Sequence, residues 1–173
     1  MRLPNKIYIT GGSGSGKTTL IKKISKVLGC PCYNQDHFKY SEDFQIKYSD
    51  DERAKRLNTV LRKKRWIIEG VYDRAWIESI LNKAELIIVL DISKMVCLWR
   101  VYKRSRSIMK ETDKHKFKDM VYLLRRTNNY KKRVHRNLLE LIENKNKEHI
   151  TLKNKRQVEK FLEDIKNHAA SAN

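Results

Sequence analysis

The sequence predicts an α/β fold in which a parallel β-sheet is covered by helices on both faces. Short apolar runs alternate with segments of helical periodicity along the 173 residues. A glycine-rich stretch, GGSGSGKTT, follows the first of these runs and precedes the first helical segment. Alternation of this kind is typical of sheets whose ligands bind at the carboxyl ends of the strands.

The strands are expected where β-branched, aromatic and aliphatic residues form short runs. Two of these runs, WIIEG and ELIIVLD, are strongly apolar and finish at or beside a carboxylate. In chain order the expected strands cover 6–10, 32–34, 66–70, 85–91 and 149–152.

Apolar residues at helical spacing predict the segments between these strands. The first helix contains Leu20, Ile24 and Leu28 and ends at Gly29, because glycine commonly terminates helices. A polar helix begins with SDDE, whose acidic residues favour a helix N-terminus. The expected helices after the first cover 50–64, 76–81, 95–102, 121–142 and 158–165, while 105–115 is polar and lacks periodicity.

Length and charge restrict the class of protein. A chain of 173 residues with 40% hydrophobic residues suits one compact domain over 1–173. Lys and Arg number 39 against 20 Asp and Glu, which gives a net charge of +19. Such a balance attracts polyanions, such as nucleotides, nucleic acid ends and acidic membranes. A lysine-rich surface kept soluble by self-repulsion explains the charge equally well.

The cysteines and the apolar runs indicate a cytoplasmic protein. There are three cysteines, Cys30, Cys32 and Cys97, and an odd number without a signal peptide favours a reducing compartment. Cys30 and Cys32 lack a second ligand pair for a metal site. The longest apolar run, LIIVL, is too short to span a bilayer.

The glycine-rich stretch fits a phosphate-binding loop, G-x-x-x-x-G-K-[ST], between a strand and a helix. Its glycines allow backbone N–H groups to turn toward phosphates, and the helix N-terminus adds partial positive charge. Lys17 would reach the β- and γ-phosphates, and the Thr18 hydroxyl would bind Mg²⁺. The predicted nucleotide-binding residues are Gly11, Gly12, Ser13, Gly14, Ser15, Gly16, Lys17, Thr18 and Thr19. The loop by itself does not separate a kinase from a hydrolase or a switch.

Carboxylates follow three of the expected strands. Asp36 is placed to accept a proton from an acceptor hydroxyl or to orient it. Glu69 would hold Mg²⁺, directly or through water, or assist the residue that accepts the proton. Asp36 is an alternative ligand of Mg²⁺ through water. Asp91 is favoured as a helix cap. The neighbours of Asp36, which either line an acceptor pocket or pack locally, are His37, Phe38 and Tyr40.

A basic region follows the fourth expected strand. Arg100 and Arg104 are four residues apart, hence on one face of a helix. An arginine that closes over a transferring phosphoryl group contributes about 10³–10⁵ in rate. We therefore expect a basic helical lid as an insertion at about 104–130. Arg125 and Arg126 are further candidates, and the sequence does not choose between them.

Three stretches make the chain similar to the DNA topology modulation (FlaR-type) proteins, small P-loop proteins related to adenylate kinase and other nucleotide and nucleoside kinases. They are WIIEGVY at 66–72, AELIIVLD at 84–91 and CLWRVYKR at 97–104. The resemblance covers about residues 5–104. It implies an adenylate kinase-like P-loop fold, three layers with a five-stranded parallel sheet and a lid. Lys17, Thr18, Arg100 and Arg104 fall on its nucleotide, Mg²⁺ and lid positions.

The departures from that family lie on the acceptor side. Glu69 and Val71 stand where the family more often has Asp and Asn. The stretch HFKYSEDFQ replaces a Trp-rich segment, and QDHFK also resembles uridine and nicotinamide riboside kinases. The acceptor is thus the part of the reaction that the resemblance defines least.

Three hypotheses follow. The first is a kinase that uses ATP and Mg²⁺ to phosphorylate a small acceptor such as a nucleoside, nucleotide or related metabolite; its catalytic residues would be Lys17, Asp36, Glu69, Arg100 and Arg104. The second is a nucleic-acid-associated ATPase or polynucleotide-end kinase, motivated by the charge around 100–136 but opposed by sparse aromatic residues there. The third is a nucleotide-dependent switch. The oligomeric state and a preference for ATP over GTP stay open.

Overall fold

One parallel β-sheet organises the protein. The computed structural model describes residues 3–41, 45–71, 74–108, 114–130 and 135–171. The strands are β1 Lys6–Gly11, β2 Cys32–Asn34, β3 Trp66–Gly70, β4 Leu86–Leu90 and β5 His149–Leu152. They pair in parallel in the order β2-β3-β1-β4-β5. The predicted α/β fold with a five-stranded parallel sheet is therefore confirmed.

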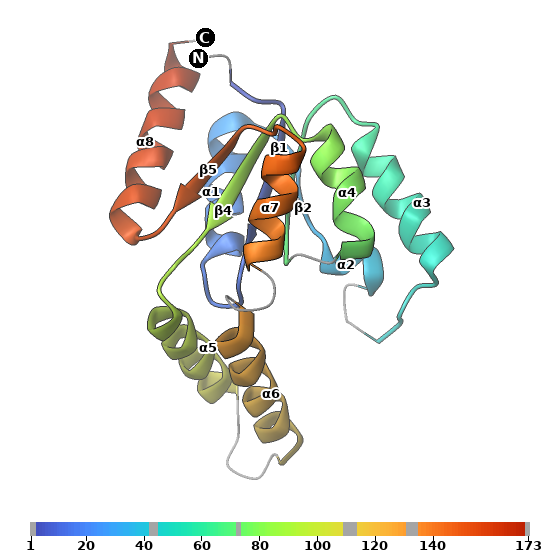
Figure 1. Cartoon of the computed structure of the whole chain (residues 1–173), viewed down its shortest axis with the longest axis vertical. Helices are drawn as coiled ribbons and strands as arrows, with labels where there is room; N and C mark the ends of the chain where they lie inside the picture. Colours follow the sequence, from blue (N-terminus) through green and yellow to red (C-terminus); the bar gives the residue numbers. More distant parts are fainter. Residues whose placement is uncertain (1–2, 42–44, 72–73, 109–113, 131–134, 172–173) are drawn as a thin grey trace.

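Helices connect the strands and cover both faces of the sheet (Figure 1). Those within the described residues are α1 Lys17–Leu28, α2 Asp36–Lys39, α3 Asp50–Leu61, α4 Arg74–Lys83, α5 Lys94–Ile108, α6 Lys114–Tyr130, α7 Arg136–Asn144 and α8 Lys155–Ala170. The helix α3 begins with a complete capping box, in which Ser49 and Glu52 each satisfy the other's backbone N–H. The expected start of this helix at SDDE is thereby explained.

Alternate residues of the central strands point into two separate cores. On β4, Leu86, Ile88 and Leu90 join α1 and α8 in one core. Ile87 and Val89 face the opposite way and join α3, α4 and α7 in the other. This alternation follows from the two-residue period of a strand, and burial on both faces explains why β4 reads as a continuous apolar run.

The register of the strands brings the polar residues to one edge of the sheet. Asn34 of β2 pairs with Glu69 of β3, and Thr10 of β1 pairs with Gly70. Because all strands run parallel, their carboxyl ends meet at this edge, where the glycine-rich loop also begins. The helices α5 and α6 pack against each other and project beyond the same edge (Figure 1).

The structure changes two local expectations. Asp36 does not simply follow a strand but begins the four-residue helix α2. The helix α5 reaches Ile108, although 105–115 lacks periodicity, because its polar residues after Val101 need no continuous apolar stripe when they are exposed. The expected helical stretch 121–142 is helical at 121–130 in α6 and at 136–142 in α7, and its residues 131–134 lie outside the described part of the chain.

The cysteines and the helices add two further findings. Cys30, Cys32 and Cys97 are all free thiols, and Cys32 alone among them is exposed. Within the part of the chain that the structure describes, no helix is both long and apolar enough to cross a membrane.

Removal of side-chain volume at the sheet centre should destabilise the fold. Ile88 is fully buried in the first core, so Ile88→Ala is expected to lower the free energy of unfolding by about 2–5 kcal/mol. Urea unfolding followed by circular dichroism measures the change. Ile46→Ala is the matched control, because Ile46 is 61% exposed and its loss should change stability by less than about 0.5 kcal/mol. Equal effects of the two variants would contradict the assigned core.

Candidate active site at the carboxyl edge of the sheet

The phosphate-binding loop leads directly into an uncapped helix. Gly16 is the N-cap residue of α1 in a left-handed conformation, and no side chain caps this helix. The first turn of α1 also lacks acidic residues, whereas α3 has three acidic residues and a capping box. The N-terminal amides of α1 therefore have no side-chain cap, which suits phosphate binding at the positive end of the helix dipole.

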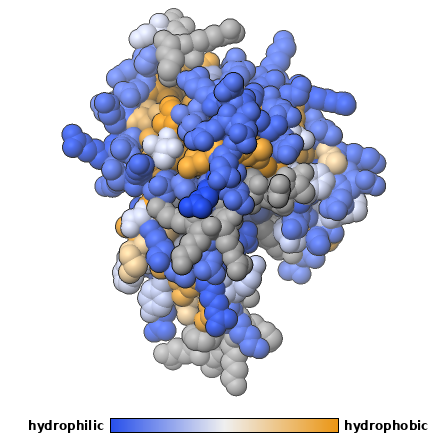
Figure 2. Space-filling view, viewed as in Figure 1, coloured by the Kyte–Doolittle hydropathy of each residue, from blue (hydrophilic) through white to orange (hydrophobic). Residues whose placement is uncertain are grey.

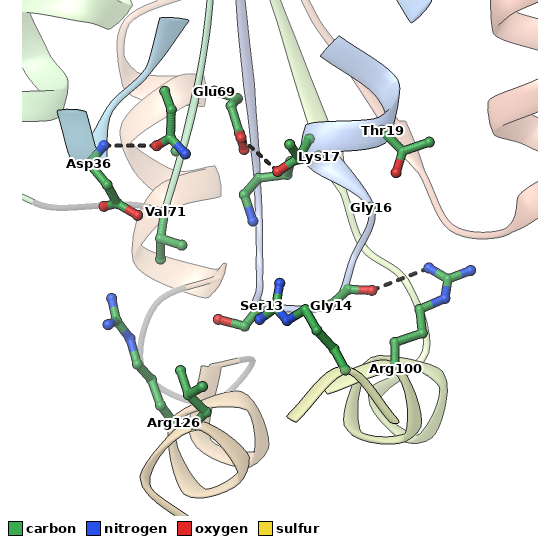
Figure 3. A pocket seen from close by; sticks show the side chains of 15 residues that line it. Ser13, Gly14, Gly16, Lys17, Thr19, Asp36, Glu69, Val71, Arg100 and Arg126 are labelled. Carbon is green, nitrogen blue, oxygen red and sulfur yellow. Dashed lines mark hydrogen bonds between the residues drawn. The ribbon is translucent and has the colours of Figure 1, made fainter. Parts of the chain in front are cut away.

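The loop lies directly against α5. Gly14 has a φ of +77°, and a Cβ atom at this position would lie 2.5 Å from the carbonyl oxygen of Cys97. Only glycine fits both the conformation and this close approach. From the next turn of α5, Arg100 donates hydrogen bonds through Nη1 to the carbonyl oxygens of Gly14, at 3.2 Å, and Ser15, at 3.4 Å. The loop and the first part of α5 thus form one contact region (Figure 3).

Lys17 is held inside the loop. Its Nζ donates hydrogen bonds of 3.0 Å to the carbonyl oxygens of both Gly11 and Gly12, and the residue is 9% exposed. Burial lowers the pKa of Lys17 below its usual value, while the nearby carboxylates of Glu69 and Asp36 act in the opposite direction. Burial disfavours the charged form of the Lys17 side chain, and an anion bound in the loop would stabilise that charged form.

Thr18 and Glu69 join the helix α1 to the end of β3. The Thr18 hydroxyl donates a 2.7 Å hydrogen bond to Oε1 of Glu69, whose residue is 3% exposed (Figure 3). Two hard oxygen ligands are thus adjacent, which fits Mg²⁺. The described residues contain no group of three or more His, Cys, Asp and Glu side chains able to hold a metal. A cation here would need further oxygen ligands from phosphate or water, as Mg²⁺ in nucleotide sites has.

Asp36 faces the loop from the opposite side of the cleft (Figure 3). Its side chain is exposed, and its backbone N–H donates to Oδ1 of Asn34 at 2.8 Å. The preceding residue, Gln35, is buried, and its N–H donates to the carbonyl oxygen of Glu69 at 2.7 Å. Gln35 therefore fixes the start of α2 relative to β3.

Gln35 also explains the glycine at the end of β3. The hydroxyl of Tyr8 donates to Oε1 of Gln35 at 3.3 Å, and any Cβ atom at Gly70 would collide with the Gln35 side chain. Gln35 could not be predicted from the sequence, since a single buried amide belongs to no motif. The adjacent QD pair after a short strand is the only local hint of its position.

These residues enclose a cleft of about 390 Å³. It contains four cationic and two anionic side chains, which face one another across the phosphate loop (Figure 3). Its residues are Ser13, Gly14, Gly16, Lys17, Thr18, Thr19, Asn34, Asp36, Glu69, Gly70, Val71, Arg100, Arg104, Leu123 and Arg126. The five side chains predicted to be catalytic, Lys17, Asp36, Glu69, Arg100 and Arg104, all line it.

The structure distinguishes Arg126 from Arg125. Arg126 of α6 lines the cleft and extends toward the side of Asp36 (Figure 3), whereas Arg125, which is exposed as Arg126 is, does not line it. Asp91 lies away from the cleft, where one carboxylate oxygen is 3.8 Å from Nε2 of His135. Two neighbouring arginines thus have different surroundings because consecutive helical residues point about 100° apart.

Two further hollows adjoin the cleft. The first, about 640 Å³, is mainly apolar and shares Gly16, Thr19 and Arg100 with the cleft; Ile92, Val96, Val158 and Leu162 are among its lining residues. The second, about 430 Å³, shares Asn34 with the cleft, and its lining includes His37, Phe38 and Tyr40 together with Tyr33, Tyr48 and Arg56. The Arg56 guanidinium lies 3.7 Å from the centre of the Tyr48 ring.

Comparison with known proteins places the chain in the P-loop NTPase class. The family model described as the NACHT domain matches residues 5–97, which is more than half of the chain. The chain therefore belongs to this family. No curated protein matches it.

Solved structures of kinases have a similar fold. Shikimate kinase from Acinetobacter baumannii, in complex with shikimate, has a TM-score of 0.55 at 16% identity and covers 98% of this chain and 94% of its own. A gluconokinase from Sinorhizobium meliloti 1021 has a TM-score of 0.54 at 15% identity, and the match covers 99% of this chain and 95% of the gluconokinase chain. Deoxyadenosine kinase from M. mycoides with bound dATP has a TM-score of 0.52 at 18% identity, and the match covers 94% of this chain and 98% of the deoxyadenosine kinase chain. At these identities the likeness shows the fold.

Replacement of Lys17 should weaken nucleotide binding. Lys17→Met keeps the length of the side chain but removes its charge and its hydrogen bonds, so we expect ATP affinity to fall at least about 10-fold. Isothermal titration calorimetry with Mg²⁺ and a non-hydrolysable ATP analogue measures the loss. Lys22→Ala, on the exposed part of α1, should bind as the wild type does. Unchanged affinity of the Lys17→Met protein would contradict a phosphate role for this side chain.

Proposed function

We propose that the protein is a kinase that transfers the γ-phosphoryl group of ATP to a small acceptor, a nucleoside, nucleotide or related metabolite. The observation that carries this proposal is the arrangement of the cleft, where Asp36 faces the phosphate loop. A hydrolase or a switch requires the loop and the cation ligands, but it does not require a second polar wall with a free carboxylate. The kinase folds of the similar solved structures support the same reaction class.

On the donor side, the triphosphate would lie along the loop with its base in the apolar hollow. Backbone amides of 13–19 and the N-terminus of α1 would bind the phosphates. Lys17 would exchange its carbonyl partners for β- and γ-phosphate oxygens. The apolar hollow begins at Gly16 and Thr19, so a base attached to those phosphates would reach it directly, beside Arg100.

Thr18 and Glu69 would hold Mg²⁺, since both provide oxygen at the point where phosphate must enter. When bound, this cation neutralises charge on the β- and γ-phosphates. Glu69 would then release its hydrogen bond from the Thr18 hydroxyl, which becomes free to act as a ligand through its oxygen.

In the transfer step, the acceptor hydroxyl oxygen would attack the γ-phosphorus while its proton passes to the Asp36 carboxylate. The bond from the γ-phosphorus to the β–γ bridging oxygen would break, and ADP would leave with the electron pair of that bond. Arg100, Arg104 and Arg126 are placed around the phosphate loop and would stabilise the charge on the transferring group and on ADP.

The helices α5 and α6 would form the lid of a single domain over 1–173. They supply Arg100, Arg104 and Arg126 to the cleft, and the basic insertion expected at about 104–130 falls on this pair. Their approach to the loop would exclude water, which would otherwise accept the phosphoryl group.

The aromatic hollow beside Asn34 would bind the ring of the acceptor. It lies directly next to Asp36, and its walls include the Tyr33, Phe38, Tyr40 and Tyr48 side chains. Flat aromatic walls with the Arg56 guanidinium suit a nucleobase or similar ring. This arrangement supports a nucleoside-like acceptor, and the resemblance of 66–72 and 97–104 to FlaR-type proteins supports placing the chain among their relatives. The three free thiols support a cytoplasmic location.

Asp36 is expected to serve phosphoryl transfer but not ATP binding. Asp36→Asn keeps the shape of the side chain and removes its basicity, so turnover should fall by about 10²–10⁴ with ATP affinity unchanged. Labelled ATP with a panel of nucleosides, nucleotides and riboside cofactors measures transfer. Asp51→Asn, at the exposed start of α3, is the control of equal charge change. Full turnover by the Asp36→Asn protein would exclude this role.

The two neighbouring arginines of α6 should differ in effect. Arg126→Ala removes a cation that lines the cleft, and we expect transfer to fall on the order of 10³-fold. Arg125→Ala makes the same chemical change at a residue that does not line the cleft and should leave transfer unchanged. Single-turnover kinetics of the two variants gives the comparison. An equal loss in both would indicate a general charge effect in place of a contact with the transferring group.

A further inference from the structure

One face of α5 carries large apolar side chains that neither core uses. Met95, Trp99 and Tyr102 are 68%, 62% and 39% exposed. They are four and three residues apart, so they lie along the same side of the helix. The Trp99 and Tyr102 rings are 6.0 Å apart between centroids and are tilted by 30°. We call these three residues the aromatic face of α5.

The aromatic face is separate from the candidate active site. Cys97 and Val101 of α5 are buried, and both lie next to Gly14 of the phosphate loop. Arg100 and Arg104 line the cleft, whereas Met95, Trp99 and Tyr102 line neither the cleft nor its two adjoining hollows. Clustered exposed apolar residues on a soluble domain indicate a surface that binds something.

The charges around the aromatic face restrict the partner. The helix α5 contains five basic residues and no acidic residue. Lys103 follows Trp99 by four positions, and Arg106 follows Tyr102 by four, so both exposed cations continue the same side of the helix. The space-filling view shows pale and orange residues among blue ones over the projecting α5–α6 pair (Figure 2).

We propose that the aromatic face of α5 binds single-stranded nucleic acid. Bases would stack on the Trp99 and Tyr102 rings, and the sugar–phosphate backbone would contact Lys103 and Arg106. Stacked bases on exposed rings beside a basic track are the usual means of binding single strands without sequence preference. A second copy of the chain fits poorly, because each copy has a net charge of +19 and α5 has no acidic residue to pair with cations.

Aromatic residues are sparse over 100–136 as a whole, but Trp99, directly before that region, and Tyr102 within it are both accessible in the structure. The inference concerns a surface outside the cleft, so it does not depend on the proposed kinase reaction.

The test uses the full chain and a fluorescein-labelled oligothymidylate of about 16 nucleotides, the upper site size of common single-strand-binding folds. Fluorescence anisotropy at about 0.15 M salt gives the affinity. Quenching of tryptophan emission reports stacking, because Trp99 is exposed whereas Trp66 is buried and Trp76 is partly buried. We expect saturable binding with quenching, and weaker binding of the same length of duplex, whose bases are not free to stack.

Variants assign the contacts. Trp99→Ala combined with Tyr102→Ala should weaken binding about 10-fold or more, because each stacked base is worth about 1–3 kcal/mol. Trp99→Phe should retain most of the affinity. Lys103→Ala with Arg106→Ala should weaken binding and reduce its salt dependence. Lys160→Ala with Lys166→Ala, two exposed cations of α8, removes the same charge elsewhere and should have a smaller effect. Circular dichroism confirms that each variant is folded.

Several results would overturn the proposal. They are absence of binding at this salt concentration, affinity that is insensitive to loss of both rings, and duplex binding as tight as single-strand binding. Light scattering tests one more such result. If the wild-type chain is a dimer and loss of the two rings makes it a monomer, the aromatic face is a contact between two copies of the chain. Loss of phosphoryl transfer in Asp36→Asn leaves this test unaffected, so the two proposals fail separately.

Discussion

The parallel pairing of β1 with β3 is the constraint on which the rest of the structure depends. It sets Ile9 opposite Glu69 and Thr10 opposite Gly70, so the loop after β1 and the carboxylate of β3 reach the same edge at the same level. The 2.7 Å hydrogen bond between Thr18 and Glu69 follows from that register. A shift of one residue would turn the Glu69 side chain to the other face of the sheet and separate the two oxygens.

Much of this arrangement could be predicted from the sequence, because strong local patterns produced it. The strands 32–34, 66–70 and 149–152 were predicted with the bounds that the structure has. The glycine-rich loop was recognised by spacing and Glu69 by its place at a strand end. Local patterns are less informative where an element is short. Four residues cannot show helical periodicity, and α2 was therefore missed.

Other features depend on contacts between distant segments. The choice between Arg125 and Arg126 requires the rotation of α6 about its axis, which depends on how this helix packs against α5. The role of Gln35 depends on Tyr8 and Glu69, which are 27 and 34 positions away. The fold, moreover, is shared with kinases named for quite different acceptors, so the fold does not define a substrate.

The uncapped start of α1 has a consequence for the energetics of the empty protein. A helix whose first amides have no side-chain partner depends on solvent for those hydrogen bonds, and its first turn opens more readily than that of a capped helix such as α3. A bound triphosphate would take the place of the missing cap. The nucleotide would then act as a removable part of the secondary structure, and the order of residues 16–20 would depend on its concentration.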